Sequence, residues 1–204
     1  MTFCAIVVAA GSGTRFGAPK HSALLDGRPL WEHGRSTLLQ AGATSVVVVG
    51  DVEGGVRGGS RRRDSVAAGL AALASDCPYV LVHDAARPLA TVSLARAVAD
   101  RIEMGDVDAV VPVLAVTDAI KRVDSQGIAS AVDRTDLVAV QTPQGFVVST
   151  LQAAHAEVDG DAADDAELVE RWGGRVGTVP GERTNLKITY PSDLVTAGSL
   201  LETL

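Results

Sequence analysis

The chain of 204 residues is long enough to bury the core of one domain, and 47% hydrophobic with 21% charged residues is typical of a globular protein. A formal net charge of −7 and an aromatic content of 3% argue against a non-specific nucleic-acid surface and against base-stacking platforms. The sequence contains no apolar run long enough to cross a bilayer and no pattern typical of a secretory leader, so we expect a cytoplasmic protein.

The first predicted element is an apolar strand at 5–10 that runs directly into a glycine-rich turn. Glycines let successive backbone N–H groups turn toward an anion, and two cations in the turn add full positive charge. The turn carries Gly11, Gly13, Arg15, Gly17 and Lys20. Its spacing is neither that of a P-loop nor a clean dinucleotide fingerprint. The turn therefore predicts a nucleoside triphosphate held by a differently built loop, with an ordinary strand-to-helix turn as the alternative.

Apolar, valine-rich runs alternate with helical patterns after this turn. The runs are short and mostly unbroken by polar residues, which is typical of strands buried on both faces of a parallel sheet. The predicted strands are 5–10, 45–50, 79–82 and 109–114, and the predicted helices are Pro29 to Ala41, Asp64 to Ser75 and Val92 to Met104. The alternation predicts an α/β fold with a Rossmann-like, doubly wound and mostly parallel sheet, whose ligands lie beyond the carboxyl ends of the strands.

Two cysteines, Cys4 and Cys77, each lie beside apolar residues. This usage argues against a disulfide framework or a zinc cluster. We therefore expect both to be buried free thiols.

Three consecutive arginines, Arg61 to Arg63, follow the glycine pair Gly58-Gly59. The pattern predicts a helix start capped by Asp64 or Ser65. Because the run is short and the chain is acidic, a solvated turn or a local phosphate contact is favoured over nucleic-acid binding.

A carboxylate, Asp84, follows the third predicted strand. It is placed to meet a ribose or a Mg²⁺ ion bound to triphosphate, because this hard cation prefers oxygen ligands and keeps phosphate in its shell. The alternative is a turn cap paired with Arg87. We interpret His83 as a structural hydrogen-bonding residue rather than a base, since transfer to an anionic phosphate needs no proton abstraction.

The segment 116–137 breaks the alternation of strands and helices. Two weakly alternating stretches, 120–124 and 128–132, flank a Ser-Gln-Gly turn and predict a hairpin. A two-stranded arm is marginal alone and needs a partner surface, so the hairpin either packs on its own subunit or projects toward another. Because no linker or repeat occurs elsewhere, we expect one domain over 1–204.

Two later segments complete the candidates. The segment 140–146 predicts a strand end followed by a turn that offers the hydroxyl of Thr142. Lys187 alternates with apolar neighbours, which predicts a short strand with Asn185, Lys187 and Thr189 on one face. By itself the pattern favours a solvated lysine at a sheet edge.

The order of these motifs resembles the 2-C-methyl-D-erythritol 4-phosphate cytidylyltransferase family from Ala5 to about Leu194. The matching segments are AAGSGTRFGAPK, GGSRRRDSV, VHDAARP, DAIKRVD, VDR, QTPQGF, DDA and NLKITYPSDL. The resemblance implies a cytidylyltransferase of isoprenoid precursor synthesis that uses CTP, a polyol phosphate and a divalent cation such as Mg²⁺. It also implies a homodimer in which the arm of a neighbouring subunit completes the acceptor pocket.

The resemblance assigns roles to individual residues. Three cations would be catalytic and stabilise charge on the α-phosphate and the departing pyrophosphate: Arg15, Lys20 and Lys187. The nucleotide would be bound by Ala9, Ala10, Gly11, Gly13, Gly59, Ser65 and Asp84. The acceptor would be bound by Arg134, Thr142, Asp84 and Lys187. Asp84 would also be the metal ligand, unless the phosphates of CTP alone hold the cation.

Three positions depart from the pattern of the family. Ala119 and Ala163 stand where threonines are common, and His21 stands where glutamine often follows the Pro-Lys pair. The two alanines fall on the acceptor side. The acceptor is therefore either 2-C-methyl-D-erythritol 4-phosphate or another polyol phosphate such as ribitol 5-phosphate, and a non-catalytic nucleotide-binding relative is the remaining alternative.

Overall fold

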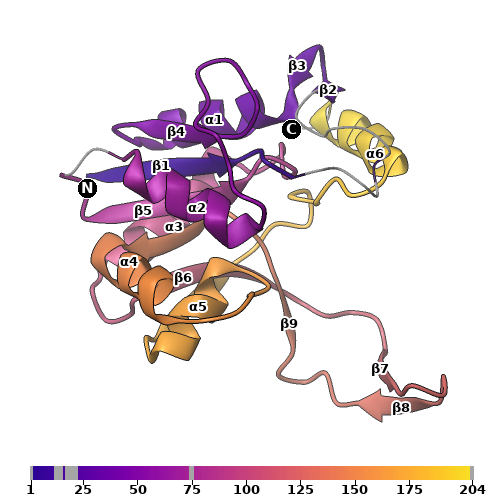
Figure 1. Ribbon diagram of the computed structural model, residues 1–204. Coiled ribbons are helices and arrows are strands. Elements are labelled where there is room, and N and C mark those ends of the chain that lie inside the picture. Colours follow the sequence, from indigo (N-terminus) through magenta and orange to yellow (C-terminus); the bar gives the residue numbers. More distant parts are fainter. Residues whose placement is uncertain (1, 12–15, 17–22, 74–75, 203–204) are drawn as a thin grey trace.

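The computed structural model describes residues 2–11, 16, 23–73 and 76–202, which form a central sheet with helices on both faces (Figure 1). The strands of the sheet are β1 (Phe3–Val8), β4 (Val46–Val49), β5 (Tyr79–Asp84), β6 (Ala109–Ala115), β9 (Val138–Val140), β10 (Gln144–Val147) and β11 (Val176–Pro180). The helices are α1 (Leu30–Ala41), α2 (Arg62–Ala71), α3 (Val92–Glu103), α4 (Val148–Glu157), α5 (Asp165–Trp172) and α6 (Pro191–Leu201). No helix within the described ranges combines the length and apolarity that crossing a membrane requires.

The sheet has the strand order β11-β6-β10-β5-β1-β4, with β9 paired to the far end of β6. Strand β1 runs parallel to β4 and β5, and β11 runs parallel to β6. Strand β10 is antiparallel to both of its neighbours. The predicted α/β, doubly wound and mostly parallel sheet is therefore confirmed.

Alternate residues of β1 enter two separate cores. Ala5 and Val7 pack on the side of α1 and α3, whereas Ile6 packs on the side of α2, α4 and α5. A strand presents successive side chains to opposite faces, so a strand covered on both faces must be apolar throughout. This requirement explains the unbroken valine-rich runs of the sequence.

Helix α2 begins earlier than predicted. Its N-cap is Arg61, and Asp64 lies in the first turn, where its Oδ2 accepts a hydrogen bond from the Arg61 backbone N–H (3.1 Å). The prediction that Asp64 or Ser65 caps the helix is therefore wrong, because the arginines belong to the helix start itself. The helix ends at Ala71, and residue 75 lies outside the described residues.

The predicted strand around Lys187 is also wrong. Asn185 is fully buried while Lys187 is exposed, so the two side chains do not share a face. The backbone here makes single contacts instead of a ladder: the Ile188 N–H donates to the Ala86 carbonyl (2.8 Å). The side-chain Nδ2 of Asn185 donates to the Thr142 carbonyl (2.9 Å).

The prediction of two free thiols is likewise corrected, because Cys4 and Cys77 are joined as a disulfide. Cys4 lies in β1, and Cys77 precedes β5, the parallel neighbour of β1. This pairing brings the two Cα atoms to 5.8 Å, within the range that a disulfide spans.

The segment between β6 and β9 extends away from the body as an arm (Figure 1). Its tip is a two-stranded antiparallel sheet of β7 (Ile120–Val123) and β8 (Ala129–Val132). Residues 121–131 are all exposed, so the hairpin does not pack on its own subunit. Five of the exposed large apolar side chains belong to the arm and its base: Val123, Ile128, Leu137, Val138 and Val140.

Two helical glycines provide a matched test of the packing. A Cβ atom at Gly69 in α2 would lie 2.7 Å from Ile6 Cγ2 and 3.0 Å from Val49 Cγ2, both fully buried, whereas a Cβ atom at Gly198 in α6 would meet nothing within 4 Å. We expect Gly69→Ala to lower the free energy of unfolding by about 1–2 kcal/mol, because overpacking outweighs helix propensity.

The control, Gly198→Ala, should raise that free energy by up to about 1 kcal/mol. Denaturant unfolding of both variants measures the two effects. A stabilised Gly69→Ala variant would contradict the close packing of α2 on β1.

Candidate functional site

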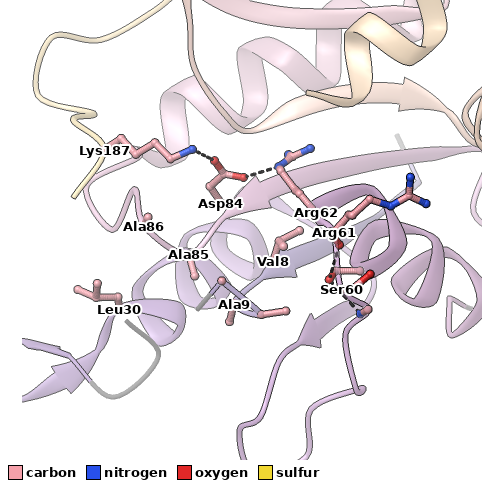
Figure 2. Close-up of a pocket in the computed structure, with 14 residues that line it drawn as sticks. Val8, Ala9, Leu30, Ser60, Arg61, Arg62, Asp84, Ala85, Ala86 and Lys187 are labelled. Atoms are coloured by element: carbon pink, nitrogen blue, oxygen red, sulfur yellow. Dashed lines mark hydrogen bonds and ion pairs between the residues drawn. The ribbon is translucent and has the colours of Figure 1, made fainter. Parts of the chain in front are cut away.

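A cavity of about 510 Å³ opens at the carboxyl ends of β1 and β5 (Figure 2). Val8, Ala9, Ala10 and Gly11 line it from the end of β1, and Asp84 lines it from the end of β5. The other lining residues are Leu30, Gly59, Ser60, Arg61, Arg62, Ser65, Ala85, Ala86 and Lys187. The cavity therefore lies where open α/β sheets bind ligands.

The glycine pair before α2 packs directly against the β1 end. A Cβ atom at Gly58 would lie 2.5 Å from Ala10 Cβ and 2.8 Å from Ser65 Oγ, and a Cβ atom at Gly59 would lie 2.3 Å from Asp64 Cβ. The Ser65 hydroxyl holds this turn, because it accepts from the Gly59 N–H (3.2 Å) and donates to the Arg61 carbonyl (3.1 Å). The close approach presents the N-terminal end of α2, which favours negative charge, to the cavity.

Asp84 is held between two cations at the cavity (Figure 2). Its Oδ1 accepts from Arg62 Nε (3.1 Å), and its Oδ2 accepts from Lys187 Nζ (2.7 Å). Burial opposes the charged form of Asp84, but Arg62 and Lys187 outweigh burial and hold its pKa well below the usual range. The carboxylate therefore stays ionised, and neither of its oxygens lacks a cationic partner.

Arg62 continues these ion pairs away from the cavity. Its NH1 donates to Oδ2 of Asp165, the first residue of α5, and Oδ1 of Asp165 accepts from His155 Nε2 (3.2 Å) in α4. Burial opposes the charge of Arg62, while Asp84 and Asp165 raise its pKa above the ordinary value. The guanidinium thus joins two carboxylates from distant parts of the chain.

The other two arginines have different partners. Arg61, the N-cap of α2, pairs with Asp64 in the first turn of the helix (2.7 Å). Arg63 donates to the backbone carbonyls of His155, in the last turn of α4, and of Val158, just after the helix (both 2.9 Å). A solvated turn therefore does not describe Arg62 or Arg63, because Arg62 connects α2 to α5 and Arg63 connects α2 to the end of α4 and the segment after it.

His83 and Thr142 lie directly beneath Asp84. The Asp84 N–H donates to Thr142 Oγ1 (3.0 Å), which also lies 3.0 Å from His83 Nδ1, and His83 Nε2 donates to the Arg87 carbonyl (3.1 Å). Burial lowers the pKa of His83 to about 4. The imidazole is therefore neutral near pH 7 and accepts the Thr142 hydroxyl at Nδ1, which confirms its structural role.

The structure brings most of the described site candidates together. Those that line the cavity are Ala9, Ala10, Gly11, Gly59, Ser65, Asp84 and Lys187. Thr142 is buried and bonded to Asp84 instead of lining the cavity, and Arg134 lies on the arm, where its guanidinium reaches the carbonyl of Val116. Five positions fall outside the described residues: Gly13, Arg15, Gly17, Lys20 and His21.

The sequence interpretation did not distinguish Arg62 from its neighbours. Its partners Asp84 and Asp165 lie 22 and 103 residues away, so no local pattern could pair them. The position of Arg62 in the sequence is the one feature that points to the site, because Arg62 starts a helix that follows a glycine pair, next to the expected cavity. A helix start of this kind places its first side chains at the ligand edge of the sheet.

The comparisons with known proteins agree on one family. The sequence model of 2-C-methyl-D-erythritol 4-phosphate cytidylyltransferase matches residues 3–203. A protein of that name from Rhodococcus jostii (strain RHA1) is 47% identical over 216 residues, covering 97% of this chain and 94% of the relative. A similar protein from Rhodococcus opacus (strain B4) is 46% identical over 216 residues, with the same coverage.

A solved structure extends the match to the fold. The crystal structure of 2-C-methyl-D-erythritol 4-phosphate cytidylyltransferase from Thermus thermophilus superposes with a TM-score of 0.83 at 34% identity. The superposition covers 97% of this chain and 98% of that one. The likeness therefore includes the sheet, its helices and the connections between them.

The buried His83 predicts a pH-dependent stability. Because its pKa falls from 6.5 to about 4 on folding, the unfolded chain takes up a proton that the folded chain excludes, and stability is lost as pH falls through this window. We expect a loss of up to about 3 kcal/mol of unfolding free energy from this group between pH 6.5 and pH 4.

Denaturant unfolding across that window should show a shallower pH slope for His83→Gln than for the wild-type chain. Equal slopes in the two proteins would contradict the assignment of the titration to His83.

Proposed function

Because the chain belongs to the 2-C-methyl-D-erythritol 4-phosphate cytidylyltransferase family, and is thus a nucleotidyltransferase, we propose that it transfers the cytidylyl group of CTP to 2-C-methyl-D-erythritol 4-phosphate. The products are CDP-methylerythritol and pyrophosphate. The observation that carries the proposal is the single cavity that joins the end of β1, the start of α2, Asp84 and Lys187. These are the segments that match the family motifs.

In the proposed reaction an oxygen of the acceptor phosphate attacks the α-phosphorus of CTP. A new P–O bond forms there, the bond from the α-phosphorus to the bridging oxygen breaks, and pyrophosphate leaves with that oxygen. No base is needed, because the attacking phosphate is already anionic. Catalysis then consists of positioning and of stabilising negative charge, which is the role of Lys187, Arg15 and Lys20 in this proposal.

The nucleotide would enter with its base beside the glycine pair. Gly59, Ser65, Ala9 and Ala10 surround that end of the cavity, and backbone N–H groups and carbonyls there can form hydrogen bonds with the edge of cytosine. Gly11 and the start of α2 face the same space and favour the triphosphate. A small, apolar lining with few polar groups is typical of a pocket that selects one base.

The divalent cation is proposed to arrive with CTP. Both oxygens of Asp84 accept from cations, and the described residues contain no group of three or more His, Cys, Asp or Glu that could hold a metal ion. Asp84 as a metal ligand stays a prediction that this geometry does not favour. A cation held by the phosphates and water would neutralise charge on the triphosphate.

The arm at 116–137 is proposed to complete the acceptor site of a second copy in a homodimer. Arg134 lies on the arm and not among the residues that line the cavity of its own chain, so in this proposal it binds the acceptor phosphate of another subunit. The exposed apolar side chains of the arm would be covered in the same contact. The rest of 1–204 is proposed to form one domain.

Turnover with two acceptors tests the reaction. We expect pyrophosphate release from CTP with 2-C-methyl-D-erythritol 4-phosphate, loss of release in excess EDTA and recovery with added Mg²⁺. Faster turnover of ribitol 5-phosphate would instead identify a cytidylyltransferase for another polyol phosphate. Ala119 and Ala163, which are both exposed, are the residues that motivate this alternative. Absence of turnover with both acceptors would favour the non-catalytic alternative.

Oligomeric state tests the role of the arm. Sedimentation should give a dimer for the wild-type chain, and Arg134→Ala should raise KM for the acceptor by about 10-fold or more while leaving KM for CTP within about 2-fold, because a charged hydrogen bond to phosphate is lost. Lys121→Ala, on the same arm, is the matched control and should change neither KM. A fully active monomer would contradict the exchanged arm.

A further inference from the structure

Four charged side chains form an alternating series from the interior to the cavity. Asp165 pairs with Arg62, Arg62 with Asp84, and Asp84 with Lys187. The exposed fractions of the side chains are 0% for Asp165, 24% for Arg62, 11% for Asp84 and 44% for Lys187. Asp165, at the inner end of the series, is therefore fully buried, and Lys187, at the outer end, lines the cavity.

Asp165 is a fixed anchor for this series. The preceding residue, Asp164, caps α5 by accepting from the Glu167 N–H (2.9 Å), and it also accepts from Gln144 Nε2 in β10 (2.7 Å). Asp165 itself uses one oxygen for Arg62 and the other for His155. The position of its carboxylate is thus set by a strand and two helices, independently of any ligand.

Arg62 can fix the position of Asp84 relative to Asp165 because its guanidinium is planar. Nε binds Asp84 and NH1 binds Asp165, so the orientation of one carboxylate fixes the plane in which the other is held. Lys187, in contrast, has a flexible stem, and among the described residues the one side chain to which its ammonium donates is Asp84. An exposed lysine paired with one mobile carboxylate would be poorly placed.

Net stabilisation of the fold is a weaker explanation for Arg62. A buried ion pair contributes little net stability, because desolvation offsets the Coulombic attraction. In addition, NH2 of Arg62 is buried without a hydrogen-bond partner in the described part of the chain. Stability of the fold alone therefore does not explain the arrangement, whereas holding charge in place for binding does.

We propose that Arg62 is a positioning residue: anchored by Asp165, it orients Asp84 and thereby places the Lys187 ammonium at the cavity. The inference rests on the proposed function, in which Lys187 stabilises charge on the reacting phosphates. It also assigns a role to the segment Ala163-Asp164-Asp165. In this chain that segment acts through the buried carboxylate of Asp165, while Ala163 has no hydroxyl to offer.

The main test compares neighbouring arginines. Arg62→Lys keeps the charge but cannot bridge both carboxylates, so we expect kcat to fall by about 10- to 100-fold with KM for CTP nearly unchanged. Asp165→Asn should lower kcat in the same direction. The matched control is Arg63→Gln, because Arg63 lies in the same helical turn but donates to backbone carbonyls at the end of α4 and just after it; the kcat of this variant should stay within about 3-fold of wild type.

Chemical rescue separates positioning from a general structural role. Free guanidinium at millimolar concentration should restore kcat of Arg62→Ala by about 10-fold, because the vacated space lies between two carboxylates, and it should leave Lys187→Ala unchanged. If Arg62→Ala does not fold, a crystal structure of Arg62→Lys gives the same information. Displaced Asp84 and Lys187 side chains would support the proposal.

Three outcomes would overturn the inference: wild-type kcat and KM in Arg62→Lys, a loss in Arg62→Ala that guanidinium leaves unchanged, or unmoved Asp84 and Lys187 in the Arg62→Lys structure. Failure of the wild-type chain to release pyrophosphate counts against the proposed function instead. In that case the crystal structure of the variant still decides the inference about Arg62.

Discussion

Parallel pairing of β1 with both β4 and β5 is the constraint on which the site depends. Val8, the last residue of β1, stands opposite Val49 and Asp84 in the two ladders, so three connections leave the sheet at one level. These connections supply the glycine turn, the segment that leads to α2, and the residues that follow Asp84. Because all three begin at the same edge, a cavity forms there before any ligand-specific side chain is considered.

Local physical chemistry made the body of the fold predictable. Strands covered on both faces must be apolar, so β1, β4, β5 and β6 are recognisable from their valines, and helices α1 and α3 from their spacing. The alternation of apolar and polar residues around Lys187 does not mark a strand, because the backbone there makes single tertiary hydrogen bonds instead of the ladder of a sheet. The bridge between Cys4 and Cys77 was missed because it depends on the pairing of strands across a separation of 73 residues.

The candidate site was predictable as a set of motifs but not as a set of contacts. The glycine turn after the first strand, Asp84 at the end of a strand and the motif around Lys187 are all visible in the sequence. Which cation meets which carboxylate depends on how α2, α4 and α5 pack on the sheet. For the same reason Thr142 was expected at the ligand, whereas its hydroxyl is used by the backbone of Asp84 and by His83.

The arm carries a consequence for the isolated chain. β7 and β8 form a sheet of two strands, so each has an outer edge with backbone groups that are free to pair with another strand. Such edges are templates for aggregation, and charged residues are the usual protection against it. Lys121 and Arg122 lie on β7, and Asp133 and Arg134 follow β8. These charges protect the edges of β7 and β8 against such pairing.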